Sequence, residues 1–259
     1  MFSSAAFKRW TRAEMARRPL VLFRVAFALV WLVYDVIDFT QRQTLGIVDF
    51  SKFQMNHTFF TAAQLTVIVC ELGLLIGFKA RWFAFGACLA RGVMAYFFGL
   101  NDFLYYSVVA FILSQADCEN ASSPKALAWP RDVLILQTAW IYFSTAFLKL
   151  NPLFTTGGDL YVRQNYIART VFFYYPEFYL KWISDIGNNA VLAWGAIVGE
   201  FTLAALLFIW WFKPKRRKEL RRGVILLACC IHLYAAYFLD VFFFGASMLA
   251  QVILLTLGD

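Results

Sequence analysis

The sequence has 259 residues, of which 61% are hydrophobic and only 15% are charged, and its mean hydropathy is +0.63. An average soluble domain is about 45–50% apolar and about 25% charged, so this composition excludes a soluble single domain. The chain has 6 prolines, 14 glycines and 19% aromatic residues without a biased repeat. Disordered and fibrous chains are therefore excluded too, because so much apolar surface has to be buried. We expect a membrane protein.

Apolar runs predict the membrane-spanning helices, each of which needs about 20 residues for a full crossing. The first run covers residues 20–39 and follows five basic residues and Pro19. It is too long for the core of a signal peptide, and no small-residue cleavage site follows it, so we expect an uncleaved span. The further runs cover residues 59–77, 82–99, 103–115, 133–150, 190–212, 223–239 and 241–257. The predicted fold class is therefore all-α, a polytopic bundle of about eight transmembrane helices that forms a single domain over residues 1–259.

The distribution of lysines and arginines predicts the orientation of these helices. With the N-terminus in the cytoplasm, sixteen of the 24 basic residues fall on the cytoplasmic side, five on the outside and three within the runs. Cytoplasmic loops are enriched in basic residues, so we expect both chain ends inside and a location in the cytoplasmic (inner) membrane. The net charge of +8 then gathers on one face, which includes the basic segment 1–18. There it attracts anionic lipid headgroups rather than nucleic acid.

Two loops are long enough to hold structure, residues 40–58 and 151–189, and both are expected outside. Binding and catalytic residues concentrate on loops, so function is expected on that face. The second loop carries ten aromatic residues. This composition suits a helix that lies at the membrane interface, but a simple belt of interfacial aromatic side chains explains it equally well.

Motifs of soluble enzymes are absent from the sequence. The five cysteines form no CxxC pair, and His57 and His232 are the only histidines, so neither a disulfide framework nor a zinc site is expected. No phosphate-binding glycine loop and no nucleophile motif is present. The glycine pairs at 73–77 and 195–199 are typical of close helix packing.

Ionisable residues within the apolar runs carry most of the information. A charge at the centre of the bilayer costs roughly 2.5 to 3.5 kcal/mol on insertion scales, so each such residue is a candidate for function or for an internal pair. Glu71 and Arg91, on consecutive antiparallel helices, can form an ion pair that only fixes the packing. Asp35, Asp38 and Asp240 lie near the outer ends of their runs, where we expect them to be hydrated.

Lys149 ends a strongly apolar run, just before Pro152 and the aromatic loop. A lysine that is shielded from water loses stability in its charged form and becomes a usable base near neutral pH. A lysine at the end of a span can instead extend its ammonium group to the interface. The residues alone leave both interpretations open.

Several sequence elements follow one another in a characteristic order along the chain. They are Arg24 within VLFRV (residues 21–25), Glu71 within CELGLLIGFKAR (70–81), Lys149 after Tyr142-Phe143 with a glycine at 157 or 158, then Glu200, a basic loop, and His232 before Phe243-Phe244. In this order they resemble the transmembrane domain of the HTTM superfamily, which is the membrane part shared with vitamin K-dependent gamma-carboxylase. The resemblance extends over nearly the whole chain.

The resemblance implies an eight-helix bundle and, in the carboxylase branch, a lysine at the position of Lys149 that deprotonates a reduced quinone. The large domain that binds the peptide substrate of the carboxylase has no counterpart in this sequence. Phe154 stands where a tryptophan is usual, and Asp102 or Phe103 stands where a histidine is expected beside the turn at Asn101. Peptide carboxylation by this chain alone is therefore not expected. A branch of small bacterial membrane proteins fits the length better.

These observations predict a membrane protein that binds a lipid-soluble ligand, such as a quinone or hydroquinone, in an outward-facing cavity. Lys149 is the candidate base and His232 a second candidate catalytic residue. The residues expected to line or support the ligand site are Glu71, Arg91, Glu200, Arg24 and Asn101. Whether the protein is an enzyme stays open. The alternative is a non-enzymatic accessory or scaffolding subunit with membrane-protein partners, whereas a transporter would favour two related halves, which the sequence does not reveal.

Overall fold

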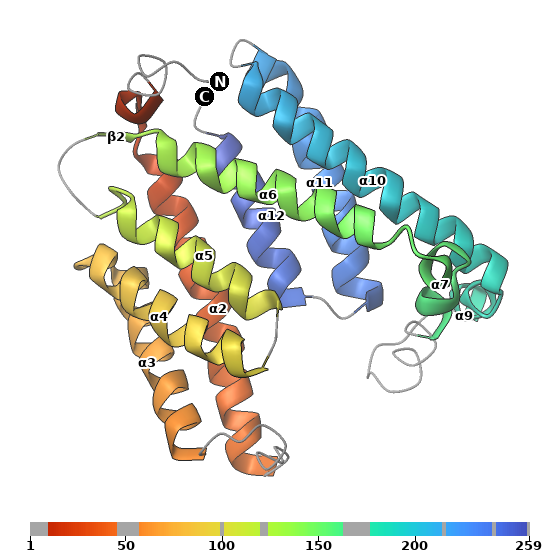
Figure 1. Cartoon of the computed structure of the whole chain (residues 1–259), viewed down its shortest axis with the longest axis horizontal. Coiled ribbons are helices and arrows are strands. Elements are labelled where there is room, and N and C mark those ends of the chain that lie inside the picture. Colours follow the sequence, from red (N-terminus) through yellow and green to blue (C-terminus); the bar gives the residue numbers. More distant parts are fainter. Residues whose placement is uncertain are drawn as a thin grey trace. The chain divides into compact units, whose positions relative to one another are not determined.

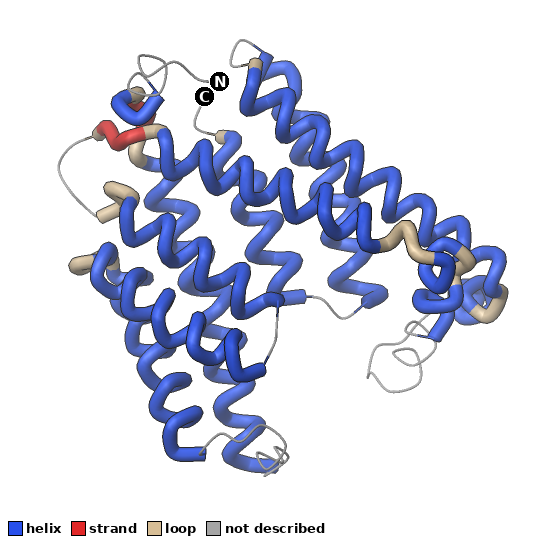
Figure 2. Tube along the Cα trace, viewed as in Figure 1, coloured by secondary structure: helices blue, strands red, loops and turns tan. Residues whose placement is uncertain are grey.

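Helices make up most of the chain in the computed structural model (Figures 1 and 2). The structure describes residues 10–45, 57–98, 101–119, 124–162, 177–213, 216–239 and 242–257. These residues fall into two compact units, one formed by residues 1–134 with 253–259 and the other by residues 135–252.

Among the residues that the structure describes, the first unit contains the helices α2 to α5 and a small sheet. Its elements are β1 (Glu14–Ala16), α2 (Arg18–Leu45), α3 (His57–Ile76), α4 (Ala80–Phe98), α5 (Asn101–Gln115) and β2 (Lys125–Leu127). Each helix packs on the next, α2 on α3, α3 on α4 and α4 on α5. The ring of Tyr106 on α5 lies 4.9 Å from Phe27 and 5.2 Å from Trp31, both on α2, measured between ring centroids. These buried aromatic contacts link the first helix of the unit to the last.

Close packing of α3 on α4 depends on Gly73. A Cβ atom at this position would lie 2.3 Å from the ring of Phe83, a distance that no real contact reaches. The predicted role of the 73–77 glycine pair in helix packing is thus confirmed at Gly73. At Gly195 the same prediction is wrong within the described chain, because no side-chain or neighbouring backbone atom lies within 4 Å of an added Cβ.

Strands β1 and β2 form an antiparallel pair that the hydropathy pattern did not predict (Figure 2). Glu14 lies opposite Leu127 and Ala16 opposite Lys125. Next to the sheet, Arg17 forms an ion pair with Asp117 and donates a hydrogen bond to the carbonyl oxygen of Lys125 at 3.0 Å. The segment before α2 and the segment after α5 therefore lie together, so the four helices return the chain to the end from which it started.

The second unit is built around α10. Its elements are most of α6 (Trp129–Leu148), α7 (Pro152–Thr155), α9 (Glu177–Ile183), α10 (Ile186–Phe212), α11 (Arg217–Leu239) and most of α12 (Phe242–Thr256). Helix α10 packs on α7, α9 and α11. Two side-chain caps begin helices here: Asn151 accepts a hydrogen bond from the amide of Phe154 at 3.0 Å, and Asp185 accepts one from Gly187 at 2.7 Å.

Each of the eight predicted apolar runs coincides with one helix over most of its length. Three of the described helices are long and apolar enough to cross a membrane, over Arg18–Thr40, Thr58–Ile76 and Ile186–Phe212. The other described helices are shorter, as α5 and α12 are, or less apolar over a comparable length, as α11 is in its basic first turns. The all-α fold class is thus confirmed, with three candidate membrane-spanning helices, while the number eight and the orientation stay predictions.

Candidate functional site

A polar face runs along α6 in the second unit. Thr138, Tyr142, Thr145 and Lys149 follow one another at intervals of four, three and four residues, which places them on one side of a helix. The intervening side chains are mostly apolar. Each of these four side chains meets a polar side chain from another helix.

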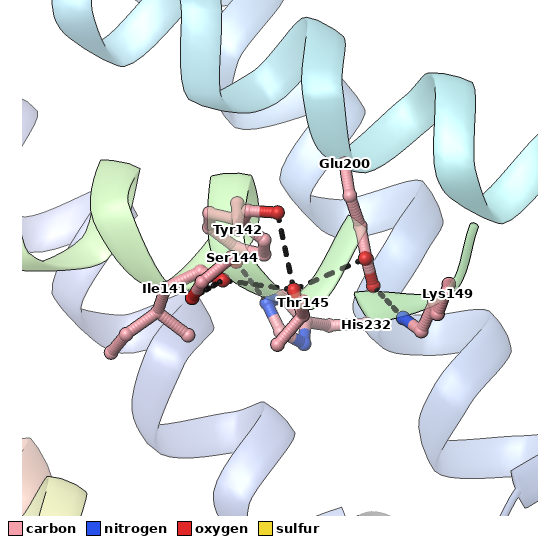
Figure 3. A network of polar contacts seen from close by, with 7 residues as sticks. All are labelled: Ile141, Tyr142, Ser144, Thr145, Lys149, Glu200 and His232. Atoms are coloured by element: carbon pink, nitrogen blue, oxygen red, sulfur yellow. Dashed lines mark hydrogen bonds and ion pairs between the residues drawn. The ribbon is translucent and has the colours of Figure 1, made fainter. Parts of the chain in front are cut away.

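Lys149 and Glu200 lie at one end of this face (Figure 3). The ammonium group of Lys149 forms an ion pair with Oε1 of Glu200 on α10. Thr145 donates to the other carboxylate oxygen, Oε2, at 3.1 Å. The side chain of Lys149 is 28% exposed and that of Glu200 is 10% exposed, so the pair is largely shielded. Both oxygens of Glu200 are thus engaged by groups from α6.

His232 extends the face toward α11 and α12. Its Nε2 shares a hydrogen bond with the hydroxyl group of Tyr142 (Figure 3). On the other side of the ring, a Cβ atom added to Gly245 of α12 would lie 3.3 Å from Nδ1 of His232. The glycine therefore lets the α12 backbone approach the imidazole closely. One turn further along α6, Gln251 of α12 donates to Thr138 at 2.7 Å.

Aromatic rings lie around the charged end of this network. The Nζ atom of Lys149 lies 5.7 Å from the ring centroid of Phe154, which is buried against α10. The rings of Phe143 and Phe201 meet edge to face with their centroids 5.7 Å apart. The arrangement offers a proton donor, a carboxylate acceptor, an imidazole and a phenol beside apolar rings. Groups of these kinds can donate and accept hydrogen bonds and can exchange protons.

A second group of predicted site residues lies in the first unit. Arg91 of α4 forms an ion pair with Asp35 of α2, and its Nη2 lies 3.9 Å from Oε1 of Glu71 on α3. All three side chains are fully buried. The predicted proximity of Glu71 and Arg91 is confirmed at 3.9 Å, and Asp35 forms the close ion pair with the same arginine. The prediction that Asp35 is hydrated is wrong, because α4 and its arginine cover the carboxylate.

The remaining predicted residues lie apart from these two groups or have no described side chain. Arg24 is buried, and Cys118 and Glu119 are the groups whose charges act on it. Asn101 begins α5, but its side chain lies outside the described ones, as does the whole of Asp240. Asp38 accepts a hydrogen bond from Gln64 at 2.9 Å. Lys149, Glu200 and His232 are therefore brought together in one unit, and Glu71 and Arg91 in the other.

Sequence reasoning missed the partners of the charged residues. Thr145 and Tyr142 were not selected as site residues, although their spacing from Lys149 on one helix face was a usable signal. Asp35 and Tyr106 in the first unit were missed because pairing between helices far apart in sequence leaves no local pattern. Within the described ranges, no three His, Cys, Asp or Glu side chains lie close enough together to hold a metal ion.

The cysteines are free thiols and differ in burial. Cys118 follows the end of α5, is fully buried, and donates to the carbonyl oxygen of Leu113 at 3.7 Å. Burial raises the pKa of the Cys118 thiol to about 11, while the nearby guanidinium of Arg24 acts in the opposite direction. The thiol is therefore protonated at neutral pH and unreactive.

No protein-family model, curated protein or solved structure matches the chain. The similarity to the HTTM superfamily accordingly stays a prediction that is based on the sequence motifs.

Proposed function

We propose that the chain is an integral protein of the cytoplasmic membrane that binds a lipid-soluble ligand of the quinone or hydroquinone type beside Lys149. The observation that carries this proposal is the polar face of α6, along which Lys149 and Thr145 contact Glu200 and Tyr142 contacts His232 inside an otherwise apolar helical unit. Polar groups at membrane depth are costly and therefore mark candidate sites for ligands or protons.

The proposed topology has eight crossings with both chain ends in the cytoplasm. The pairing of β1 with β2 supports it, because the basic segment before α2 and the segment after α5 must then lie on the same side of the membrane. Exposed basic side chains follow the end of α10 and continue into the first turns of α11, among them Lys213, Arg216, Lys218 and Arg222. Anionic lipid headgroups are the expected partners of this charge.

The donor set at Lys149 suits a ring with two oxygen atoms. The ammonium group can donate a hydrogen bond to a carbonyl oxygen of a quinone. When its proton has passed to Glu200, the neutral amine can instead accept the proton of a hydroquinone O–H, and Lys149 then acts as the base. Thr145 holds the Glu200 carboxylate in place, and Phe154 offers an apolar ring on the lysine side. His232, held by Tyr142, is the second group that can exchange a proton.

A binding titration tests the proposal. The full chain in lipid nanodiscs is titrated with a short-chain quinone and with the corresponding hydroquinone, each against Lys149→Met and against Lys181→Met as the control. Lys181 lies on α9 and is exposed, so its loss should leave binding unchanged. We expect saturable binding that Lys149→Met weakens at least tenfold, which corresponds to about 1.4 kcal/mol. Equal binding by all three proteins, or none by the wild type, would contradict the proposal and favour the accessory subunit.

A further inference from the structure

The buried charges of the first unit do not balance. Asp35 and Glu71 are two carboxyl groups, Arg91 is one guanidinium, and all three side chains have no exposed surface. Like charges that share a buried site do not both ionise readily, and burial of a net charge is unfavourable without a compensating partner. With both carboxyl groups ionised, the cluster would hold one uncompensated negative charge in the interior of a helical unit.

The geometry distinguishes the two carboxyl groups. Asp35 forms the close ion pair with Arg91, whereas Glu71 lies 3.9 Å from the same nitrogen. Within the described part of the chain, no hydrogen bond of ordinary geometry reaches either oxygen of Glu71, and the Tyr106 hydroxyl and the Asp35 carboxyl group interact with it only more loosely. A fully buried carboxylate requires several donors. Glu71 is therefore the carboxyl group that lacks what an ionised form would need.

The groups that face Glu71 come from each neighbouring helix. They are Asp35 on α2, Arg91 on α4 and Tyr106 on α5, with Cys70 beside it on α3 itself and Asp38 further along α2. Arg91 is enclosed by aromatic rings whose centroids lie 4.4 to 5.9 Å from its Cζ atom, those of Trp31, Tyr34, Phe103 and Tyr106. Arg91 is thus the only cation that faces Glu71 in the described chain, and Asp35 holds it.

We propose that Glu71 is a proton-binding site and that the cluster Asp35, Arg91 and Glu71 holds one exchangeable proton, carried by the Glu71 carboxyl group. A metal cation is a poorer occupant, since the adjacent guanidinium repels it and the surrounding aromatic rings offer few of the oxygen ligands that it requires. A proton needs a single oxygen and balances the charge. This site lies in a different unit from Lys149, so the inference does not depend on the proposed function.

Infrared difference spectroscopy detects such a proton directly. The carbonyl stretch of a protonated carboxylic acid is separate from that of a carboxylate, and the band shifts when water is exchanged for D₂O. We expect the wild type at neutral pH to show a deuterium-sensitive carboxylic acid band that Glu71→Gln removes and that Asp35→Glu retains. If the spectrum of the Glu71→Gln variant keeps the whole band, or the wild type lacks it, the inference is wrong.

Thermal stability gives an independent comparison of the two carboxyl groups. Glutamine reproduces a neutral carboxylic acid, so Glu71→Gln should fold and melt close to the wild-type Tm. Asp35→Asn leaves Arg91 without its counterion and should lower the Tm by about 10 °C or prevent folding. Equal losses in both variants would overturn the inference. A rise in Tm when Na⁺ replaces choline, absent from Glu71→Gln, would overturn it in favour of a metal cation.

Discussion

Lys149 and Glu200 show how a single charged residue is tolerated inside an apolar helical unit. Their side chains form an ion pair that is largely shielded from solvent, and Thr145 donates to the second carboxylate oxygen. When one partner is removed, the other charge stays largely buried without a counterion. When both are removed, no buried charge remains. The energetic cost of a single substitution therefore exceeds that of the double one.

This reasoning predicts a non-additive mutant cycle. Lys149→Met and Glu200→Gln should each lower the free energy of unfolding by about 2 kcal/mol, and the double variant should lose less than the sum of the two. The three variants and the wild type are compared by thermal unfolding in the same detergent. A double variant whose loss equals the sum would show that the two side chains do not interact.

Cys118 lies outside the apolar helices, and its buried thiol predicts that the stability of the folded chain depends on pH. Burial raises the pKa of its thiol in the folded chain from the ordinary value of 9.0 to about 11. Below pH 9 the thiol is protonated in both states and its contribution to stability is fully present. As the pH rises from about 9 to about 11, the unfolded chain loses the proton first, so stability falls by about 2 to 3 kcal/mol.

The measurement is the Tm of the wild type and of Cys118→Ala between pH 8 and pH 11. Lysine and tyrosine side chains titrate in the same range, so the difference between the two proteins isolates the thiol. We expect that difference to shrink as the pH rises, because the wild type loses a contribution that alanine never had. Parallel curves would show that Cys118 is not buried in the folded chain.

At the scale of elements, Gly157 places α7 against α10. Its φ of +80° lies in the left-handed region, and a Cβ atom would come within 2.3 Å of the backbone nitrogen of Ala190. That contact holds Phe154 in the buried cluster with Ala193 and Ile197, and Phe154 in turn faces the ammonium group of Lys149. The position therefore connects the packing of two helices to the candidate site.

Alanine substitutions at two glycines of the second unit test this connection. Gly157→Ala should destabilise the chain by about 3 kcal/mol or more, through backbone strain and overlap with α10. Gly195→Ala is the matched control, because an added Cβ there meets no atom within 4 Å, and its Tm should be unchanged or slightly higher. Equal melting temperatures of the two variants would contradict the connection between Gly157 and the packing of α7 on α10.

Sequence patterns predicted the helices well because hydropathy alone determines which segments can be buried along their whole length. The ends were less predictable, since local chemistry sets them. Helix α10 begins at Ile186 after the cap of Asp185, earlier than its apolar run. Helix α11 begins at Arg217, because lysine, arginine, glutamate and leucine favour a helix even where the segment is polar.

The sheet and most partners of the buried charges could not be read from the sequence, although the proximity of Glu71 and Arg91 was predicted from consecutive helices. Strands β1 and β2 have three residues each, too few for an alternating pattern, and they pair across more than 100 positions. Lys149 and Glu71 were identified because a charge in an apolar run stands out. Glu200 was identified for the same reason, but its pairing with Lys149, like the contacts of Thr145 and Asp35, depends on which helices pack together, a property of tertiary structure.

At the scale of the whole molecule, the distribution of charge predicts which loops share a side of the membrane. Single cysteines introduced into a cysteine-free variant at Glu14, Asp159 and Lys218, all exposed positions, report on this. We expect a membrane-impermeant maleimide to label Asp159→Cys in intact cells, and Glu14→Cys and Lys218→Cys only after the membrane is opened. Labelling of all three positions from one side would contradict the eight-crossing topology.

The central claim is that the chain holds a lipid-soluble ligand at Lys149. Native mass spectrometry tests this claim on protein that is extracted in the mildest detergent that keeps it intact. Lipid extraction of the same sample then identifies what is bound, so no ligand has to be chosen beforehand. The account predicts an apolar ligand bound to the wild type and to Lys181→Met, and lost from Lys149→Met. A chain without ligand that carries protein partners in fixed stoichiometry would contradict it and identify a subunit of a larger membrane complex.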